Sequence, residues 1–189
     1  MELWGILALV IVMLLAMILI VFLFIYNNLV RLKNNIQKSW ANIDVLLKQR
    51  SDELPNLIAS VKGYMNHERT TLEVLTKART DVLQATTLSK KAAVDSVITE
   101  MLKTLFAIAE NYPNLKANEN FLKLQVRITA LENELADRRE FYNDSVNIYN
   151  IRIHSIPDVL VARMMNCTNE PLFKASEQDR AVVSVSLGM

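Results

Sequence analysis

The chain opens with an apolar run that carries no polar stripe. No charged residue lies within residues 3–25. At a rise of 1.5 Å per residue, a helix of this length spans about 35 Å, which exceeds the hydrocarbon thickness of a bilayer. A core helix of a soluble domain would keep a polar stripe, and a cleaved signal peptide would have a basic start and a shorter apolar stretch. The pattern therefore predicts a transmembrane anchor over residues 1–26.

A one-sided apolar stripe follows over residues 27–50, and its steps of three and four residues predict that the helix continues out of the membrane. Pro55 is expected to interrupt it, because the ring lacks an N–H donor and disfavours helical geometry at Leu54. Ser51 or Asp52 would then cap a new helix. A kink that leaves two nearly collinear helices is the alternative. The stripe consists of Leu29, Leu32, Ile36, Trp40, Ile43 and Leu47.

Three more amphipathic stripes predict helices over about residues 55–86, 90–112 and 121–153. Ser89 is the expected N-cap of the 90–112 helix, and Pro157 is expected to close the helical region. The stripe of the 90–112 helix is Val94, Val97, Ile98, Met101, Leu105, Ile108 and Ala109. The 121–153 helix has a near-heptad seam of Phe121, Leu124, Ile128, Leu131, Leu135, Arg138, Tyr142, Val146, Tyr149 and Ile153.

The scarcity of turn residues supports an all-α fold. The chain has three glycines and four prolines, whereas sheets and loops need many more such residues. Amphipathic helices with short connections bury their stripes best in a bundle. We therefore expect a transmembrane helix that continues into an antiparallel four-helix bundle over residues 27–157, followed by an extended C-terminal tail over residues 158–189.

The end of the tail has two interpretations. Residues 181–187 alternate in part and are rich in β-branched side chains, which is typical of a strand. Val182, Val183 and Val185 would then add a strand to a partner or to another copy of the chain. The alternative is a disordered terminus.

Polar side chains line one side of the 121–153 helix. Asn143, Asn147 and Asn150 are spaced so that they stack along one flank, and Tyr142 and Tyr149 lie beside them. These residues are either a partly solvated flank of the bundle or a hydrogen-bonded ladder that fixes helix register or faces another subunit.

Charged residues also occur at or near the apolar faces. Glu68, Arg79, Glu132 and Arg138 occupy such positions, where an unpaired charge is costly. We expect them to form ion pairs between helices and not a reactive site.

No motif predicts catalysis, a cofactor or a metal. His67 is followed by Glu68, but a zinc-protease helix needs a second histidine where this chain has Thr71. Cys167 is a lone thiol with no signal for a neighbouring base. A phosphate-binding glycine loop is absent from the sequence, and a net charge of +1 is no nucleic-acid footprint.

The flanking charge predicts an orientation. Arg31, Lys33 and Lys38 follow the apolar run, and no Lys or Arg precedes it. The positive-inside rule then places the N-terminus outside and the bundle in the cytoplasm. The three cations are also placed to meet anionic lipid headgroups.

Three ordered blocks resemble the bacterial LemA family, which includes MamQ-like magnetosome-membrane proteins. The first block is LPNL at 54–57, VKGY at 61–64 and His67-Glu68; the second is ENYPNLKA at 110–117; the third comprises Glu132, Arg138-Arg139, Tyr142-Asn143, Tyr149-Asn150 and Pro157. The apolar run followed by Tyr26-Asn27 is similar to the family's N-terminal helix. The resemblance implies a single-pass protein of the bacterial inner membrane with a helical bundle, no defined catalytic activity, and association with a membrane metallopeptidase of the HtpX type.

We therefore expect a membrane-anchored, non-catalytic helical scaffold or adaptor. Its expected partners are the lipid bilayer, further copies of itself in a homo-oligomer, or another membrane protein. The alternative is a regulatory partner of an HtpX-like membrane protease in envelope stress or quality control. An anchor supports either role, because it raises the local concentration of the bundle near membrane partners.

Overall fold

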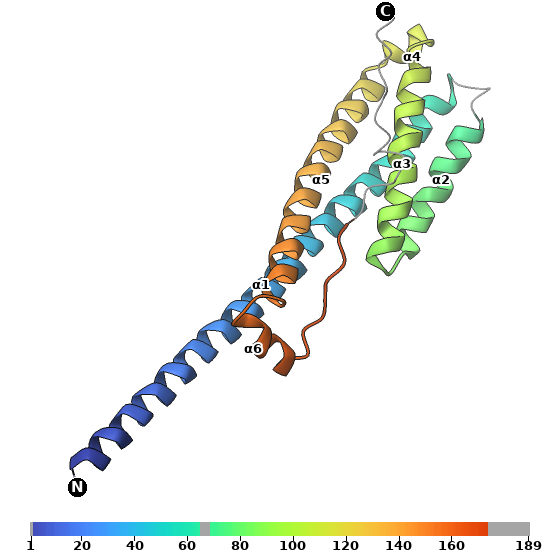
Figure 1. Cartoon of the computed structure of the whole chain (residues 1–189). Coiled ribbons are helices and arrows are strands. Elements are labelled where there is room, and N and C mark those ends of the chain that lie inside the picture. Colours follow the sequence, from blue (N-terminus) through green and yellow to red (C-terminus); the bar gives the residue numbers. More distant parts are fainter. Residues whose placement is uncertain (1, 65–68, 174–189) are drawn as a thin grey trace, which may run out of the picture. The chain divides into compact units, whose positions relative to one another are not determined.

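The computed structural model describes residues 2–64 and 69–173, and this part of the chain forms six helices without a strand (Figure 1). The elements are α1 (Glu2–Lys62), α2 (Arg69–Gln84), α3 (Leu88–Ala109), α4 (Pro113–Lys116), α5 (Glu119–Arg152) and α6 (Asp158–Met164). The predicted all-α class is confirmed. Val182, Val183 and Val185, the residues of the predicted strand, lie outside the described residues, as do His67 and Glu68.

The described chain divides into two compact units, and both dividing points fall inside a helix. The anchor unit consists of residues 2–40 and 141–172, and the bundle unit consists of residues 41–64 and 69–140 together with Phe173. Each unit therefore contains one part of α1 and one part of α5.

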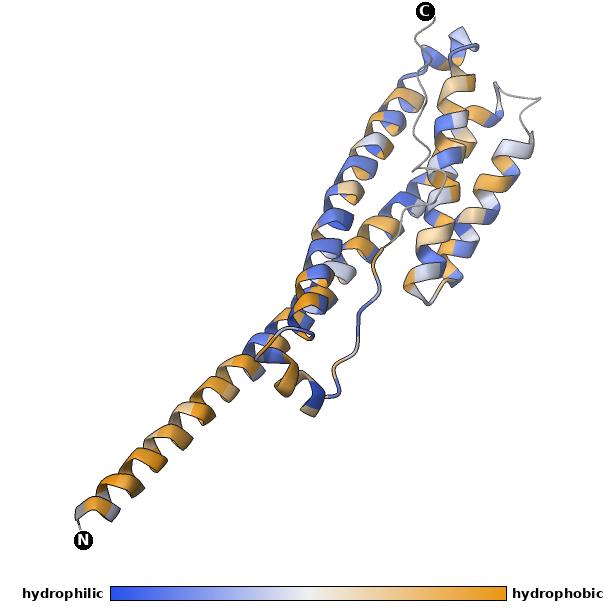
Figure 2. Ribbon diagram, in the orientation of Figure 1, coloured by the Kyte–Doolittle hydropathy of each residue, from blue (hydrophilic) through white to orange (hydrophobic). Residues whose placement is uncertain are grey.

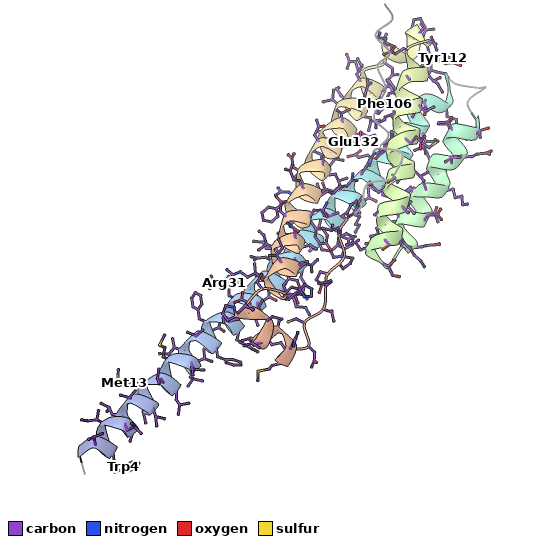
Figure 3. All side chains as sticks on the ribbon, in the orientation of Figure 1. Trp4, Met13, Arg31, Phe106, Tyr112 and Glu132 are labelled. Carbon is purple, nitrogen blue, oxygen red and sulfur yellow. The ribbon has the colours of Figure 1, made fainter. Side chains whose placement is uncertain are left out.

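The N-terminal part of α1 has the properties of a membrane span. Its side chains are predominantly apolar on every face, as the mainly orange ribbon in Figure 2 shows. Nearly all of them lie exposed. Trp4 and Met13, both labelled in Figure 3, have 79% and 65% of their surface exposed. Ile25, by contrast, is buried to 6% exposure. By length and composition, this is a helix able to cross a membrane.

The predicted interruption at Pro55 is wrong. α1 passes through Pro55 and continues to Lys62, so Ser51 and Asp52 lie inside the helix and cap nothing. The packing explains why, because Leu54 and Leu57 on either side of the proline are both 0% exposed. Their burial outweighs the one backbone hydrogen bond that the proline cannot donate.

The chain reverses after Lys62 instead of at the proline. The Tyr64 amide donates to the Val61 carbonyl oxygen at 2.9 Å, which closes a turn around Gly63. The predicted second helix over 55–86 is consequently divided between the end of α1 and α2. Of the two arrangements considered for Pro55, the collinear one is closer to the structure.

The bundle unit packs the C-terminal part of α1, α2, α3 and the N-terminal part of α5 around one core, with neighbours in the chain running antiparallel (Figure 1). Phe106 contacts Phe121 edge-on, with ring centroids 6.2 Å apart. Phe106 and Tyr112, labelled in Figure 3, are partly buried against this core. The fully buried core members are Leu54, Leu57, Val61, Leu75, Leu102, Leu105, Leu115 and Ile128.

Two helix starts in the bundle unit are fixed by side-chain caps. Thr87, and not the predicted Ser89, caps α3: its hydroxyl accepts from the Lys90 amide at 3.4 Å. Asn118 caps α5, with its side-chain oxygen accepting from the amide of Asn120 at 3.0 Å and from that of Phe121 at 3.1 Å. Such caps satisfy amides that have no partner within the helix.

The predicted stripe of α3 faces the core at every position except Val97. The buried residues are Ala92, Asp95, Ile98, Leu102, Leu105 and Ala109, whereas Val97 is 41% exposed. Val94, Met101 and Ile108 of the predicted stripe are partly buried against the core. The stripe did not include Ala92, Asp95 and Leu102, which are buried on the same side.

The long seam of α5 is confirmed at most positions, with one shift. Phe121, Ile128, Leu131, Leu135, Tyr142, Val146, Tyr149 and Ile153 are all buried. Arg138, however, is exposed, and the neighbouring Arg139 takes its place at the seam. Pro157 does not close the helical region, because α6 follows it and buries Val161 and Ala162. Residues 166–172 then run without regular structure and are called the strap below.

Candidate functional site

The C-terminal part of α5 holds the strap through hydrogen bonds to its backbone. The side-chain nitrogen of Asn150 donates to the Glu170 carbonyl oxygen at 2.9 Å, and the Glu170 amide donates to the Asn150 side-chain oxygen at 2.9 Å. The Tyr142 hydroxyl donates to the Pro171 carbonyl oxygen at 2.9 Å. His154 Nε2 lies 2.9 Å from the side-chain oxygen of Asn169. The polar side of α5 near its C-terminus therefore binds an extended segment of the same chain.

The two tyrosines of this flank are buried and electrically neutral. Burial, with a smaller effect of the Glu170 carboxylate, raises the pKa of Tyr142 to about 12. Burial and then the adjacent Cys167 side chain raise the pKa of Tyr149 far above its ordinary value. The Tyr149 hydroxyl has no hydrogen bond of ordinary geometry within the described chain. Because both groups stay protonated at neutral pH, they act in packing and hydrogen bonding.

The predicted asparagine ladder is not uniformly buried. Asn150 is half-buried and holds the strap, Asn143 is half-buried, and Asn147 is exposed. Tyr142 also contacts Trp40 of α1, with ring centroids 6.2 Å apart. The structure thus gives Asn150 and Tyr142 a binding partner within the chain. A role of the three asparagines in assembly stays a prediction.

The bundle unit contains a buried ion cluster. Arg50 of α1 bonds to Asp95 of α3 at 2.8 Å and to Glu132 of α5 at 3.1 Å, and it also donates to the Thr99 hydroxyl at 3.0 Å. Arg139 of α5 forms an ion pair with the second carboxylate oxygen of Asp95. Arg50 and Asp95 are each 1% exposed. Two positive and two negative charges therefore balance one another.

The electrostatics of the cluster suit a structural role. Burial lowers the pKa of Arg50, and Glu132 opposes this effect through its charge and its hydrogen bond. Arginine nevertheless remains protonated in proteins, so its buried charge needs the two carboxylates. The guanidinium of Arg139 lies 4.9 Å from the ring centroid of Phe173, a cation–π distance. The cluster thus joins three helices of the bundle and Phe173.

The ion-pair predictions had mixed outcomes. Glu132 forms the expected pair between helices. Within residues 2–64 and 69–173, the ion pair of Arg138 is with Glu134 of its own helix, at 3.4 Å and on an exposed surface, because the inward position belongs to Arg139. Arg79 has a buried Nε without a hydrogen-bond partner in the described chain.

Arg50 and Asp95, the centre of the cluster, were missed. The signal was present in the sequence: Arg50 lies three residues after Leu47 and four before Leu54, so it occupies a position where the stripe calls for an apolar residue. Asp95 lies three residues after Ala92 and three before Ile98, which is also helical spacing along one face. A charge inside a stripe on two helices at once indicates a buried pair.

The described residues offer no grouping suited to a metal. Within residues 2–64 and 69–173, no three His, Cys, Asp or Glu side chains lie close enough together to hold a metal ion. Cys167 is a free thiol of intermediate burial beside Tyr149.

Comparison with known proteins finds one family. The LemA family model matches residues 39–187. Protein LemA of Metamycoplasma hominis is 31% identical over 175 residues, which cover 88% of this chain and 78% of that protein. Magnetosome proteins MamQ 1 and MamQ 2 of Paramagnetospirillum magneticum are each 21% identical over 161 residues, covering 70% of this chain and 58% of theirs. The chain therefore spans little more than half the length of the two MamQ proteins, and none of the three names denotes an enzyme.

Proposed function

The chain belongs to the LemA family, and from this premise we propose that it is a membrane-anchored scaffold or adaptor without catalytic activity, whose bundle assembles with itself or binds another membrane protein. Family membership and the one candidate span of α1 fit a single-pass membrane protein. The names of the magnetosome relatives associate those proteins with an organelle, which is compatible with a structural role at a membrane.

One observation carries the proposal. α1 supplies the apolar span with its N-terminal part and buried core residues of the bundle with its C-terminal part. The charged groups at the centre of the bundle unit are engaged with one another, which suits a packing element better than a reactive centre. A bundle tied to a membrane in this way meets other membrane proteins at a raised local concentration.

The proposed location is the bacterial inner membrane, with the bundle in the cytoplasm. Arg31, Lys33 and Lys38 are exposed on α1 just beyond the apolar run, where Figure 3 labels Arg31. Their positive charge favours the cytoplasmic side. A C-terminal reporter that is active only in the cytoplasm should give signal, and activity of an exported reporter alone would contradict this orientation.

The test is the mass of the full chain extracted with its native lipids, together with identification of co-purifying proteins. We expect either an oligomer or a stoichiometric membrane partner. Recovery of an HtpX-like peptidase would identify the adaptor's partner and favour the regulatory alternative. A strict monomer without partners would contradict the proposal.

A chimera provides the matched control. Replacing residues 3–25 with an unrelated apolar span of equal length keeps the bundle unit intact. Assembly that survives the replacement belongs to the bundle, as proposed. Assembly that disappears would belong to the span and would contradict a scaffold role of the bundle.

A further inference from the structure

An exposed apolar surface lies at the corner between α5 and α6. Ile151, Ile156, Leu160 and Met164, named here the corner patch, are 57%, 88%, 64% and 73% exposed. Large apolar side chains gathered in this way are unusual on a surface that faces only water, and they indicate a binding or membrane-contacting face.

α6 carries apolar residues on two different faces. Asp158, Val161 and Ala162 are buried within the anchor unit, as expected for the inner face of a packed helix. Leu160 and Met164, four residues apart, share another face and are exposed. A helix whose outer face met water would carry polar residues there, so a second apolar environment is needed.

The pairing of α1 with α5 shows at which level along α1 the corner patch lies. Trp40 contacts Tyr142, and the two helices run antiparallel in the anchor unit (Figure 1). Ile153 lies about eleven residues beyond Tyr142, and Leu29 lies about eleven residues before Trp40, so at equal rise they are level with each other. Both are buried, at 4% and 1% exposure. The corner therefore begins at the level of Leu29.

That level is the edge of the membrane span. Ile25, one helical turn before Leu29, ends the charge-free run and is buried to 6% exposure. One turn corresponds to about 6 Å, which is close to the thickness of a headgroup layer. α6, which follows Ile153 in the same compact unit, is thus placed near the boundary between acyl chains and headgroups.

The chemistry around the corner suits lipid. An open hollow of about 400 Å³ is lined mainly by apolar groups, among them Ile148, Ile151, Ile156 and Pro157. The exposed cations Arg152 and Arg163 border the same corner, with Arg152 paired to Asp158 at 2.8 Å. On α1, Arg31 is exposed just beyond the apolar run. Apolar side chains bordered by arginines are typical of elements that lie in a membrane interface.

We propose that the corner patch inserts into the interface of the same bilayer that α1 spans, and thereby gives the protein a second membrane contact. Leu160 and Met164 enter the acyl boundary, and Arg163 remains among anionic headgroups. This inference requires that residues 3–25 cross the membrane, but it does not depend on the scaffold function. A monomeric protein could make the same contact.

Spin-label accessibility tests the insertion. In the full chain carrying Cys167→Ala, a nitroxide is attached at Leu160→Cys or at Met164→Cys, and the chain is reconstituted as single copies in nanodiscs of phosphatidylethanolamine and phosphatidylglycerol. Val126→Cys is the matched control, because Val126 is an equally exposed apolar residue of the bundle unit, at 69%. We expect the ratio of oxygen to water-soluble nickel collisions to be several-fold higher at Leu160 than at Val126.

Two results would overturn the proposal. A ratio at Leu160 and Met164 equal to that at Val126 would place α6 in water. Protection from both reagents would mean that protein, such as a second copy of the chain, covers the patch.

A second measurement needs no substitution. A phosphatidylglycerol with a diazirine on the acyl chain near its headgroup is photoactivated in nanodiscs that hold the unmodified chain. Adducts within residues 151–164 are expected, with Phe24, 72% exposed on the span, as the internal positive control. Adducts at the span without any in residues 151–164 would contradict the insertion.

Discussion

The two parts of α5 hold their partners by different physical means. In the bundle unit, α5 buries apolar side chains and closes a balanced ion cluster with Arg50 and Asp95. In the anchor unit, the same helix binds the backbone of an extended segment through Asn150 and Tyr142. The comparison teaches that one periodic pattern can serve two kinds of contact. Periodicity reports which side of a helix is covered, and it does not report what covers it.

The largest effect is expected from breaking the ion cluster. Arg50→Met leaves the carboxylates of Asp95 and Glu132 without their shared cation, and removal of one partner from a buried pair costs about 3–5 kcal/mol. Denaturant unfolding of the detergent-solubilised chain, followed by circular dichroism, measures this loss. Arg138→Met is the matched control, because its pair is exposed and within one helix, where about 0.5 kcal/mol is at stake. Equal losses for the two variants would contradict a special role of the cluster.

Replacement of Pro55 is expected to raise the free energy of unfolding, by less than the loss expected for Arg50→Met. Pro55→Ala restores a backbone donor inside α1, and the proline is exposed, so little packing is lost. The free energy of unfolding should rise by about 2 kcal/mol. Loss of stability in the same unfolding experiment would mean that the proline ring itself is needed in the packing of the bundle unit.

The strap should respond to a change that leaves the bundle unit unaffected. Asn150→Ala removes two hydrogen bonds to the Glu170 backbone, at a cost of about 1–2 kcal/mol. Amide exchange in residues 166–172 should become faster, while exchange in α3 stays the same. Asn147→Ala, at an exposed position on the same helix, should change neither. Unaltered exchange in the strap of the Asn150 variant would show that these hydrogen bonds do not hold it.

An effect that appears only at alkaline pH is expected at the flank that binds the strap. The pKa of Tyr142 is raised from 10.0 to about 12 in the folded chain. Between these values the unfolded chain has lost a proton that the folded chain retains, so stability falls as pH rises. The contribution is at most about 1.4 kcal/mol per pH unit. Tyr142→Phe should flatten the pH profile of the unfolding free energy above pH 10, and an unchanged slope would contradict this assignment.

Strong, uninterrupted periodicity made much of the fold predictable. The apolar run of α1 and the seam of α5 from Phe121 to Ile153 were recognised at most positions, because a long amphipathic helix has one way to bury its stripe. The reversal after Lys62 was not predicted, because the burial of Leu54 and Leu57 in the bundle overrides the local preference of Pro55 to end a helix.

Residues that depend on a distant partner were the least predictable. Asp95 faces the core only because Arg50 lies opposite, and α3 offers apolar residues on other faces as well. Asn150 and Tyr142 were recognised as candidate interaction residues, but their ligand was not, since residues 169–171 carry no periodic signal. The short α6 was missed because a single buried turn leaves little pattern to detect.

The backbone hydrogen bonds of the strap have a consequence for how this protein tolerates mutation. Asn150 and Tyr142 hold the main chain at Glu170 and Pro171, and every residue type supplies a carbonyl oxygen. Substitution of Pro171, or of Glu170 by any residue but proline, therefore changes little of what Asn150 and Tyr142 bind. Insertion or deletion of a single residue between Asp158 and Glu170 would move every backbone group out of register with α5. The number of residues between Asp158 and Glu170 is therefore constrained more tightly than their identity.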